Sequence, residues 1–121
     1  MIRRYAGGVS TDGAAAIAVE VRHDAGAALV TLGGELEFGT AASVRATFSD
    51  LAQQGDGPVV VDIAALRFID SSGLSLLVQA KQRFSAQGRR FELRHPTERV
   101  TRVIETSGLA EVFALDADES S

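Results

Sequence analysis

The fold of this chain follows from two neighbouring runs, Val59-Val60-Val61-Asp62-Ile63 and Phe68-Ile69-Asp70-Ser71-Ser72-Gly73-Leu74. The first run is β-branched and lacks polar alternation, a pattern typical of a strand covered on both faces, as in a parallel sheet. Across residues 74–86, apolar side chains recur at helical spacing, which predicts the best-defined helix of the chain. The Asp-Ser-Ser-Gly segment therefore stands where a buried strand passes into a helix.

On the N-terminal side of this centre, the sequence predicts an antiparallel hairpin. Residues 16–21 and 27–32 have the composition of strands, and the triplet Asp24-Ala25-Gly26 between them is a turn signal. Gly33-Gly34 is expected to end the second strand, and residues 35–39 are expected to form a loop.

Two further helices are predicted on either side of the central run. Thr40 is a suitable N-cap for a helix that ends before the Gly- and Pro-containing residues 53–58. Thr97 would cap the other helix, and Gly108 fits the position just past its end. Leu109 would then fold back onto that helix in a Schellman motif.

Short strands are expected at residues 90–93 and 112–115, which gives the element order β-β-α-β-α-β-α-β. Alternation of this kind argues for an α/β fold with right-handed crossovers. We expect a flexible N-terminal tail at residues 1–13, one domain at residues 14–115 and an acidic tail at residues 116–121.

Composition excludes several classes of protein. A length of 121 residues fits one domain with a core that needs no disulfides. The net charge of −4 lacks the basic excess of a non-specific nucleic-acid binder, and no apolar run approaches the roughly 18 residues of a membrane span. Cysteine is absent, and His23 and His95 have no partner at ligand spacing. We expect a cytoplasmic protein without a metal or other cofactor.

The Asp70–Gly73 segment has two interpretations. Asp and Ser are common N-caps and Gly eases a tight entry, so capping alone explains these residue types. A helix N-terminus also carries free amides and a partial positive charge that stabilise an anion, so a serine there is a good phosphate carrier. The sequence contains no phosphate loop, no G-x-G-x-x-G and no G-x-S-x-G, so nucleotide or serine-hydrolase chemistry has little support.

Other charged residues have simpler interpretations. Residues 33–37, Gly-Gly-Glu-Leu-Glu, fit a turn with solvated carboxylates as well as a functional loop. The arginines of the C-terminal half are expected to balance acidic neighbours and to solvate helix faces; they are Arg89, Arg90, Arg94, Arg99 and Arg102.

Four motifs in order carry a family resemblance. Residues 32–37, Leu-Gly-Gly-Glu-Leu-Glu, are similar to a strand-end G-E-L-D motif, and the valine run leading to Asp70–Leu74 is similar to the central motif of the same family. Lys81-Gln82-Arg83 and residues 104–109, followed by Phe113, complete the set. Over residues 14–115 the chain thus resembles the STAS domains, most closely the stand-alone bacterial anti-sigma factor antagonists. The resemblance implies a mixed four- to five-stranded sheet with helices mainly on one face.

The resemblance also implies a regulatory switch and not an enzyme. In the family, the unphosphorylated antagonist binds an anti-sigma factor that is also its serine kinase, a histidine-kinase-like ATPase, and so frees the sigma factor. Phosphorylation by this kinase ends binding, and a serine phosphatase reverses it. The family's phosphorylated serine corresponds to Ser71 and its loop acid to Glu37. The partner-binding residues expected from the resemblance are Glu37, Asp70, Ser71, Ser72, Gly73 and Leu74.

The chain departs from the family pattern at three places. Glu37 stands where the family usually has Asp, and Phe38-Gly39 follows where polar residues are common. Only about six residues follow Leu115, where most members carry a last helix. A sheet face left open in this way could be covered by a partner or by a second copy in a weak homodimer.

Two other functions stay open at this point. One is a cytosolic STAS accessory subunit of a membrane lipid or anion transporter, which need not be phosphorylated. The other is a small nucleotide-binding or hydrolytic enzyme. The intact Asp70–Gly73 motif favours the antagonist, because a pure scaffold needs no acceptor serine there.

Overall fold

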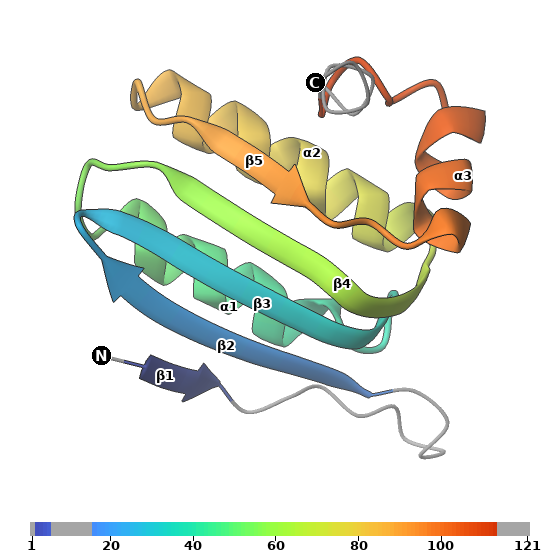
Figure 1. Ribbon diagram of the computed structural model, residues 1–121, viewed down its shortest axis with the longest axis horizontal. Coiled ribbons are helices and arrows are strands. Elements are labelled where there is room, and N and C mark those ends of the chain that lie inside the picture. Colours follow the sequence, from blue (N-terminus) through green and yellow to red (C-terminus); the bar gives the residue numbers. More distant parts are fainter. Residues whose placement is uncertain (1, 6–15, 114–121) are drawn as a thin grey trace.

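A computed structural model of the protein describes residues 2–5 and 16–113, which form one mixed sheet and three helices (Figure 1). The elements in chain order are β1 (Ile2–Tyr5), β2 (Ile17–Asp24), β3 (Ala27–Leu36), α1 (Ala41–Ala52), β4 (Val59–Ile69), α2 (Ser71–Ala86), β5 (Phe91–Arg94) and α3 (Glu98–Thr106).

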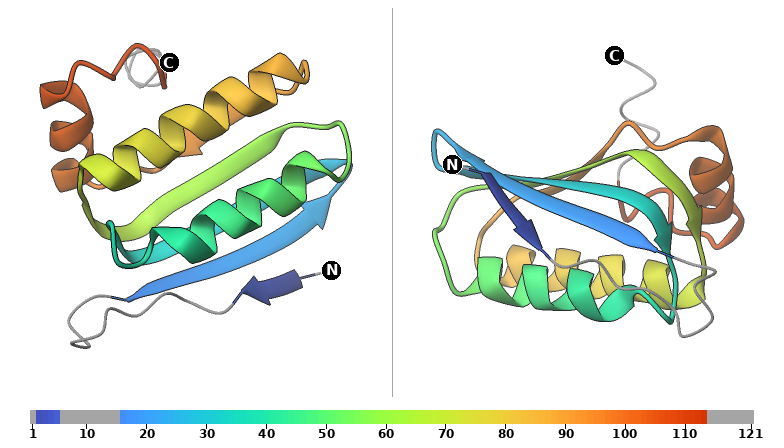
Figure 2. Two further views of the ribbon diagram at one scale, coloured as in Figure 1. Left: turned by 180° about the vertical axis from the view of Figure 1, so that it is seen from behind. Right: turned by 90° about the horizontal axis from the view of Figure 1, so that it is seen from below.

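The strand order β1-β2-β3-β4-β5 places neighbours in sequence next to each other in the sheet. β1, β2 and β3 pair antiparallel, whereas β3, β4 and β5 pair parallel. The two parallel connections run through α1 and α2, which lie side by side on one face of the sheet, while α3 lies at one end of it (Figure 2). The predicted mixed α/β sheet with helices mainly on one face is confirmed. Within the described part of the chain, no helix is long and apolar enough to cross a membrane.

The core lies between the sheet and the α1–α2 layer. At one end of this layer, three aromatic rings from α1, α2 and β5 pack together. The ring centroid of Phe48 is 6.1 Å from that of Phe84 and 5.8 Å from that of Phe91, both edge-on, while Phe84 and Phe91 stack at 5.9 Å. Such pairs add about 0.5–1.5 kcal/mol beyond the burial of their area. This cluster fixes the spacing of the two helices.

Both central strands are longer than predicted. β3 continues through Gly33-Gly34 to Leu36, because register shifts on either side of this pair let the strand pass β4 without losing its partners. Gly34 has φ +103, and a Cβ there would meet the carbonyl oxygen of Ala16. The glycines therefore form a bulged section of strand and not its end. β4 likewise runs unbroken from Val59 to Ile69 and so joins the two runs quoted from the sequence into one strand.

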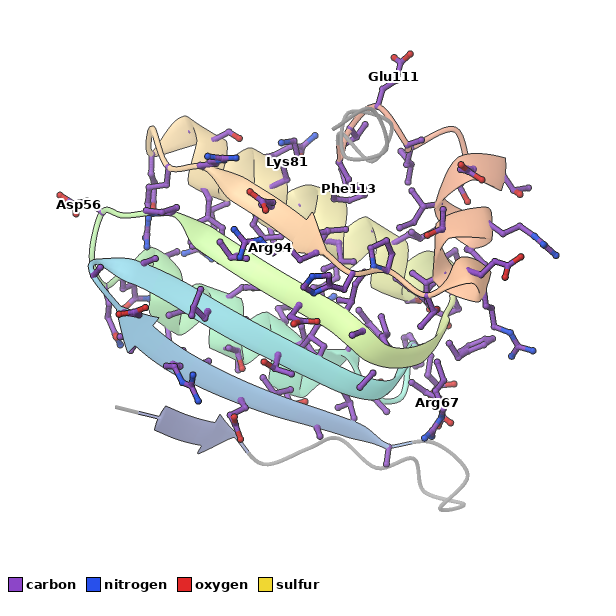
Figure 3. All side chains as sticks on the ribbon, in the orientation of Figure 1. Asp56, Arg67, Lys81, Arg94, Glu111 and Phe113 are labelled. Carbon is purple, nitrogen blue, oxygen red and sulfur yellow. The ribbon has the colours of Figure 1, made fainter. Side chains whose placement is uncertain are left out.

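The ends of the chain also correct the prediction. Residues 2–5, expected in a flexible tail, form β1, because the outer edge of β2 offers unpaired backbone groups that a short strand can satisfy. The strand expected at residues 112–115 is absent from its described part: residues 110–113 form a turn. The buried ring of Phe113 anchors that turn, so its apolar residues serve packing without sheet pairing (Figure 3).

The predicted hairpin and the predicted end of α3 are confirmed. The hairpin turns at Ala25-Gly26, both with positive φ, between antiparallel β2 and β3. At the start of α3 the Thr97 side chain accepts the N–H of Val100. At its end, the N–H of Leu109 reaches the carbonyl of Ile104 at 3.0 Å, with Gly108 at φ +75, which is a Schellman motif.

Arg89 contradicts the solvating role predicted for the arginines. Its side chain is buried, with 4% exposed, and stacks over the ring of Phe84 at 5.0 Å. Its guanidinium donates to the carbonyl oxygens of Gly57, at 2.7 Å, and Leu51, at 2.9 Å. Arg89 therefore ties the end of α1 and the following connection to α2. In contrast, Arg90, Arg94 and Arg102 do pair with acidic neighbours, as predicted; Arg94 projects from the face of the sheet opposite α1 and α2 (Figure 3).

Replacement of Arg89 should therefore destabilise the fold. We expect Arg89→Ala to lower the free energy of unfolding by about 2–3 kcal/mol, because the buried carbonyl of Leu51 and the partly buried carbonyl of Gly57 lose a charged donor. Arg90→Ala is the matched control, with an exposed side chain whose loss should cost less than about 1 kcal/mol. Urea denaturation of both variants measures the difference, and equal midpoints would contradict this role of Arg89.

Candidate functional site

The site forms where two parallel strands end at the same edge of the sheet. Leu36 and Ile69, the last residues of β3 and β4, are in register. The loop at residues 37–40 follows one and Asp70 follows the other, so the two segments meet, at the right-hand end of the sheet in Figure 1. Ligands and partners of open α/β sheets commonly bind at such carboxyl ends of strands. The Glu37 loop and the Asp-Ser-Ser-Gly motif therefore lie next to each other.

Asp70 joins the two segments directly. Its Oδ1 accepts the backbone N–H of Gly73 at 2.9 Å, which makes it the N-cap of α2. Its Oδ2 accepts the N–H of Phe38 at 3.2 Å, across the gap to the other loop. Its own N–H donates to the carbonyl of Leu36 at 3.2 Å. One carboxylate thus starts the helix and anchors the neighbouring loop.

Thr40 and Glu37 shape that loop. Thr40 precedes α1 as predicted, but its side chain makes no cap bond to the helix. Its hydroxyl instead donates to the carbonyl of Glu35 at 2.6 Å and accepts the N–H of Glu37 at 3.1 Å. The carboxylate of Glu37 accepts the N–H of Gly39 at 3.1 Å. The loop is therefore held closed by its own side chains, with the Glu37 side chain half-buried.

The two serines differ in how they meet solvent. Ser71 is exposed and Ser72 is half-buried. Among residues 2–5 and 16–113, the hydroxyl of Ser71 has no hydrogen-bond partner. It opens into a pocket of about 570 Å³ between the first turns of α1 and α2. The pocket is lined by Phe38, Ala41, Ala42, Arg45, Ser71, Ser72 and Ser75.

Gly73 and Leu74 face inward. A Cβ on Gly73 would lie 2.7 Å from the carbonyl oxygen of Leu36 and 2.8 Å from the Ile69 side chain, so only glycine lets α2 approach β3 this closely. Leu74 belongs to the core, with 6% of its side chain exposed. In the structure these two residues position the serines and do not present a surface.

Two phenylalanines give the surface around the motif an apolar character. Phe38, in the loop, is 83% exposed, and Phe68, near the end of β4, is 40% exposed. They are the large hydrophobic side chains exposed within the described residues. Exposed aromatic side chains of this kind are typical of protein interfaces.

Glu35 serves the fold and not the surface. Its carboxylate accepts from Arg67 at 2.9 Å and from the N–H of Ala16 at 3.2 Å, which joins β2, β3 and β4 at the site end of the sheet. The Arg67 hydrogen bond, followed by that from Ala16, holds the pKa of Glu35 below its ordinary value. The two carboxylates thus differ: that of Glu35 bonds across the sheet, and that of Glu37 bonds within its own loop.

Sequence reasoning did not find Arg45 or Ser75 as residues of this site. Arg45 lies on α1, and only the packing of α1 beside α2 brings it to the pocket of Ser71, so no local pattern could have indicated it. Ser75 follows Ser71 by one turn of α2, and this helical spacing is the signal that could have found it. Within the part of the chain that the structure describes, no cluster of three His, Cys, Asp or Glu side chains could hold a metal ion.

Comparison with known proteins identifies the fold and its class. The STAS domain family matches residues 17–121, so this chain belongs to the STAS domain family. The chain is 26% identical over 102 residues to the anti-sigma F factor antagonist of Paenibacillus polymyxa, covering 84% of this chain and 87% of that protein. It is 27% identical over 99 residues to the antagonist RsfB of Mycobacterium tuberculosis, covering 82% and 80%.

A solved structure agrees with these relatives. The anti-sigma factor antagonist SpoIIAA in its unphosphorylated form is 25% identical to the chain, with a TM-score of 0.66, over 85% of this chain and 97% of that one. SpoIIAA is also known in a phosphorylated form, which shares the fold with a TM-score of 0.62 at 24% identity. These relatives are regulatory proteins and not enzymes, in agreement with the prediction from sequence.

The double role of Asp70 leads to a prediction. In Asp70→Ala both the helix cap and the loop anchor are lost, so the free energy of unfolding should fall by about 1–2 kcal/mol. Amide hydrogen exchange at Phe38 and at Gly73 should both accelerate, by about fivefold or more. Ser72→Ala is the control, since the Ser72 hydroxyl bonds to no described residue. Unchanged exchange at Phe38 would show that the loop does not depend on Asp70.

Proposed function

We propose that the protein is an anti-sigma factor antagonist whose binding is controlled by phosphorylation of Ser71. The unphosphorylated form binds an anti-sigma factor that is a histidine-kinase-like serine kinase, and this binding releases the sigma factor. A serine phosphatase returns the phosphorylated form to the active one. All of this takes place in the cytoplasm, without a cofactor of the antagonist's own.

The observation that carries the proposal is the exposed hydroxyl of Ser71, which bonds to none of the described residues and lies beside the loop that carries Glu37. Asp70 performs the capping that could have explained the serines, so capping does not account for Ser71. A kinase can approach this hydroxyl without unfolding the chain. The relatives named as antagonists, one of them known in two phosphorylation states, support the same function.

The transfer itself needs nothing from this chain but the serine oxygen. A bond forms between Ser71 Oγ and the γ-phosphorus of ATP, the bond from that phosphorus to the bridging oxygen breaks, and ADP leaves with the electron pair. The serine proton passes to a base of the kinase. The product carries about −1.5 to −2 additional charges at neutral pH.

The added charge is the reason that binding should end. The phosphate would stand next to Asp70, and a partner packed over it would have to remove its water. Each 1.4 kcal/mol of binding free energy lost lowers the affinity about tenfold. Charge repulsion and the removal of water from the phosphate together should cost at least this amount. The fold itself should persist, because the Ser71 hydroxyl takes part in no bond with the described residues.

The Ser71 variants test this mechanism. Ser71→Ala should bind the nucleotide-loaded kinase as tightly as the unphosphorylated wild type, and should accept no phosphate. Ser71→Asp should bind at least about tenfold more weakly, because it carries a charge at the docking surface. Calorimetric titration gives the affinities, and mass spectrometry after incubation with kinase and ATP locates the phosphate.

Ser75 provides the matched control. It is exposed, lies one helical turn after Ser71 and lines the same pocket. Ser75→Ala should still accept one phosphate and lose affinity when it does. Equal affinity of the wild type and both Ser71 variants would remove Ser71 from the mechanism.

Glu37 is proposed to contact the partner. Glu37→Ala should weaken the complex by about three- to tenfold, because a carboxylate at the docking surface is removed. Its melting temperature should stay within a few degrees of wild type, since among the described residues the carboxylate accepts a hydrogen bond only from the exposed N–H of Gly39. Glu98→Ala, an acidic residue of α3 away from the motif, should leave the affinity unchanged. A large loss of stability in Glu37→Ala would make Glu37 a structural residue.

A further inference from the structure

The geometry points to Arg45 as the residue that binds the phosphate of phosphorylated Ser71 in the pocket between α1 and α2. This inference rests on the proposed phosphorylation of Ser71 and adds a binding site for the phosphoryl group within the antagonist itself. In the phosphorylated form the phosphate would then contact Arg45 of the same chain, in addition to preventing partner binding.

The pocket has the composition that such a site needs. Apart from Arg45, its lining consists of three serines, two alanines and the ring of Phe38, so the guanidinium is the single charged group there. Its volume of about 570 Å³ leaves room for a phosphate on Ser71. A planar guanidinium can donate two parallel hydrogen bonds to phosphate oxygens, which makes Arg the preferred partner of this group.

Arg45 is also free to move to the phosphate. It forms no ion pair or hydrogen bond with any residue that the structure describes. Asp70, next to Ser71 in sequence, is acidic and already engaged, since its carboxylate accepts two backbone N–H groups. Its charge would repel a phosphate, and the guanidinium on α1 would offset this repulsion together with the partial positive charge at the start of α2.

Arg83 offers a comparison within the same groove. Further along α1 and α2, a second pocket of about 190 Å³ is lined by Arg45 and Arg83 together with Phe48, Leu76, Gln79 and Ala80. Arg83 is exposed and unpaired among the described residues, like Arg45, but it does not line the pocket of Ser71. The two arginines thus carry the same charge in one groove and differ in access to Ser71.

The experiment installs phosphoserine at position 71 by encoded incorporation, so that no kinase is needed. The second pKa of the phosphate is then measured by ³¹P NMR in the otherwise wild-type chain, in Arg45→Gln and in Arg83→Gln. Arg45 stabilises the dianion, so Arg45→Gln should raise this pKa by about 0.3–0.7 unit. Arg83→Gln should change it by less than about 0.1 unit, because Arg83 lies outside the pocket.

The outcomes separate the two proposals. An unchanged pKa in Arg45→Gln overturns the phosphate site, and so does an equal rise in Arg83→Gln, which would reflect the general charge of the groove. If the kinase fails to phosphorylate Ser71, the proposed function fails, and the ³¹P measurement still reports on Arg45, because the phosphate was supplied during synthesis.

Discussion

The two hydrogen bonds accepted by the Asp70 carboxylate hold the site together. One oxygen binds the N–H of Gly73 at the start of α2, and the other binds the N–H of Phe38 in the loop after β3. The parallel pairing of β3 with β4 brings these segments to one edge, but pairing alone leaves the loop and the helix independent. The carboxylate makes them one surface. The close contact of Gly73 with Leu36 is possible because Gly73 has no Cβ, which would lie 2.7 Å from the Leu36 carbonyl oxygen.

In this arrangement Asp70 and Ser71 have separate roles. Because Asp70 caps the helix, the hydroxyl of Ser71 is not needed for the structure, and among the residues described it bonds to nothing. A group can therefore be added to that oxygen without breaking a hydrogen bond of the fold. Gly73 and Leu74 pack inward and hold the start of α2 against the sheet. Such a site can change its charge while its backbone stays in place.

Much of the fold could be predicted from sequence because its signals are local. The hairpin turn at Ala25-Gly26 and the Schellman end at Gly108 each depend on residues within one turn, and each is confirmed. The predictions were wrong where contacts between residues far apart in the sequence determine the structure. Gly34 was predicted to end a strand, but the register of β3 against its neighbours requires a bulge there. Arg89 was predicted to lie at the surface, but the packing of α1 against α2 buries it. The same is true of Arg45, whose closeness to Ser71 exists only in three dimensions.

An arginine beside the switch residue does not cancel the switch. A phosphoserine carries about −1.5 to −2 charges, whereas one guanidinium supplies +1, and the carboxylate of Asp70, next to Ser71 in sequence, adds a further negative charge. The surface that a partner would meet thus still becomes more negative when Ser71 is phosphorylated. The pairing acts inside the pocket, where it lowers the free energy of the phosphorylated chain on its own. Because a docked partner must either compete with this contact or bury it with the phosphate, the arginine adds to the loss of binding and does not oppose it.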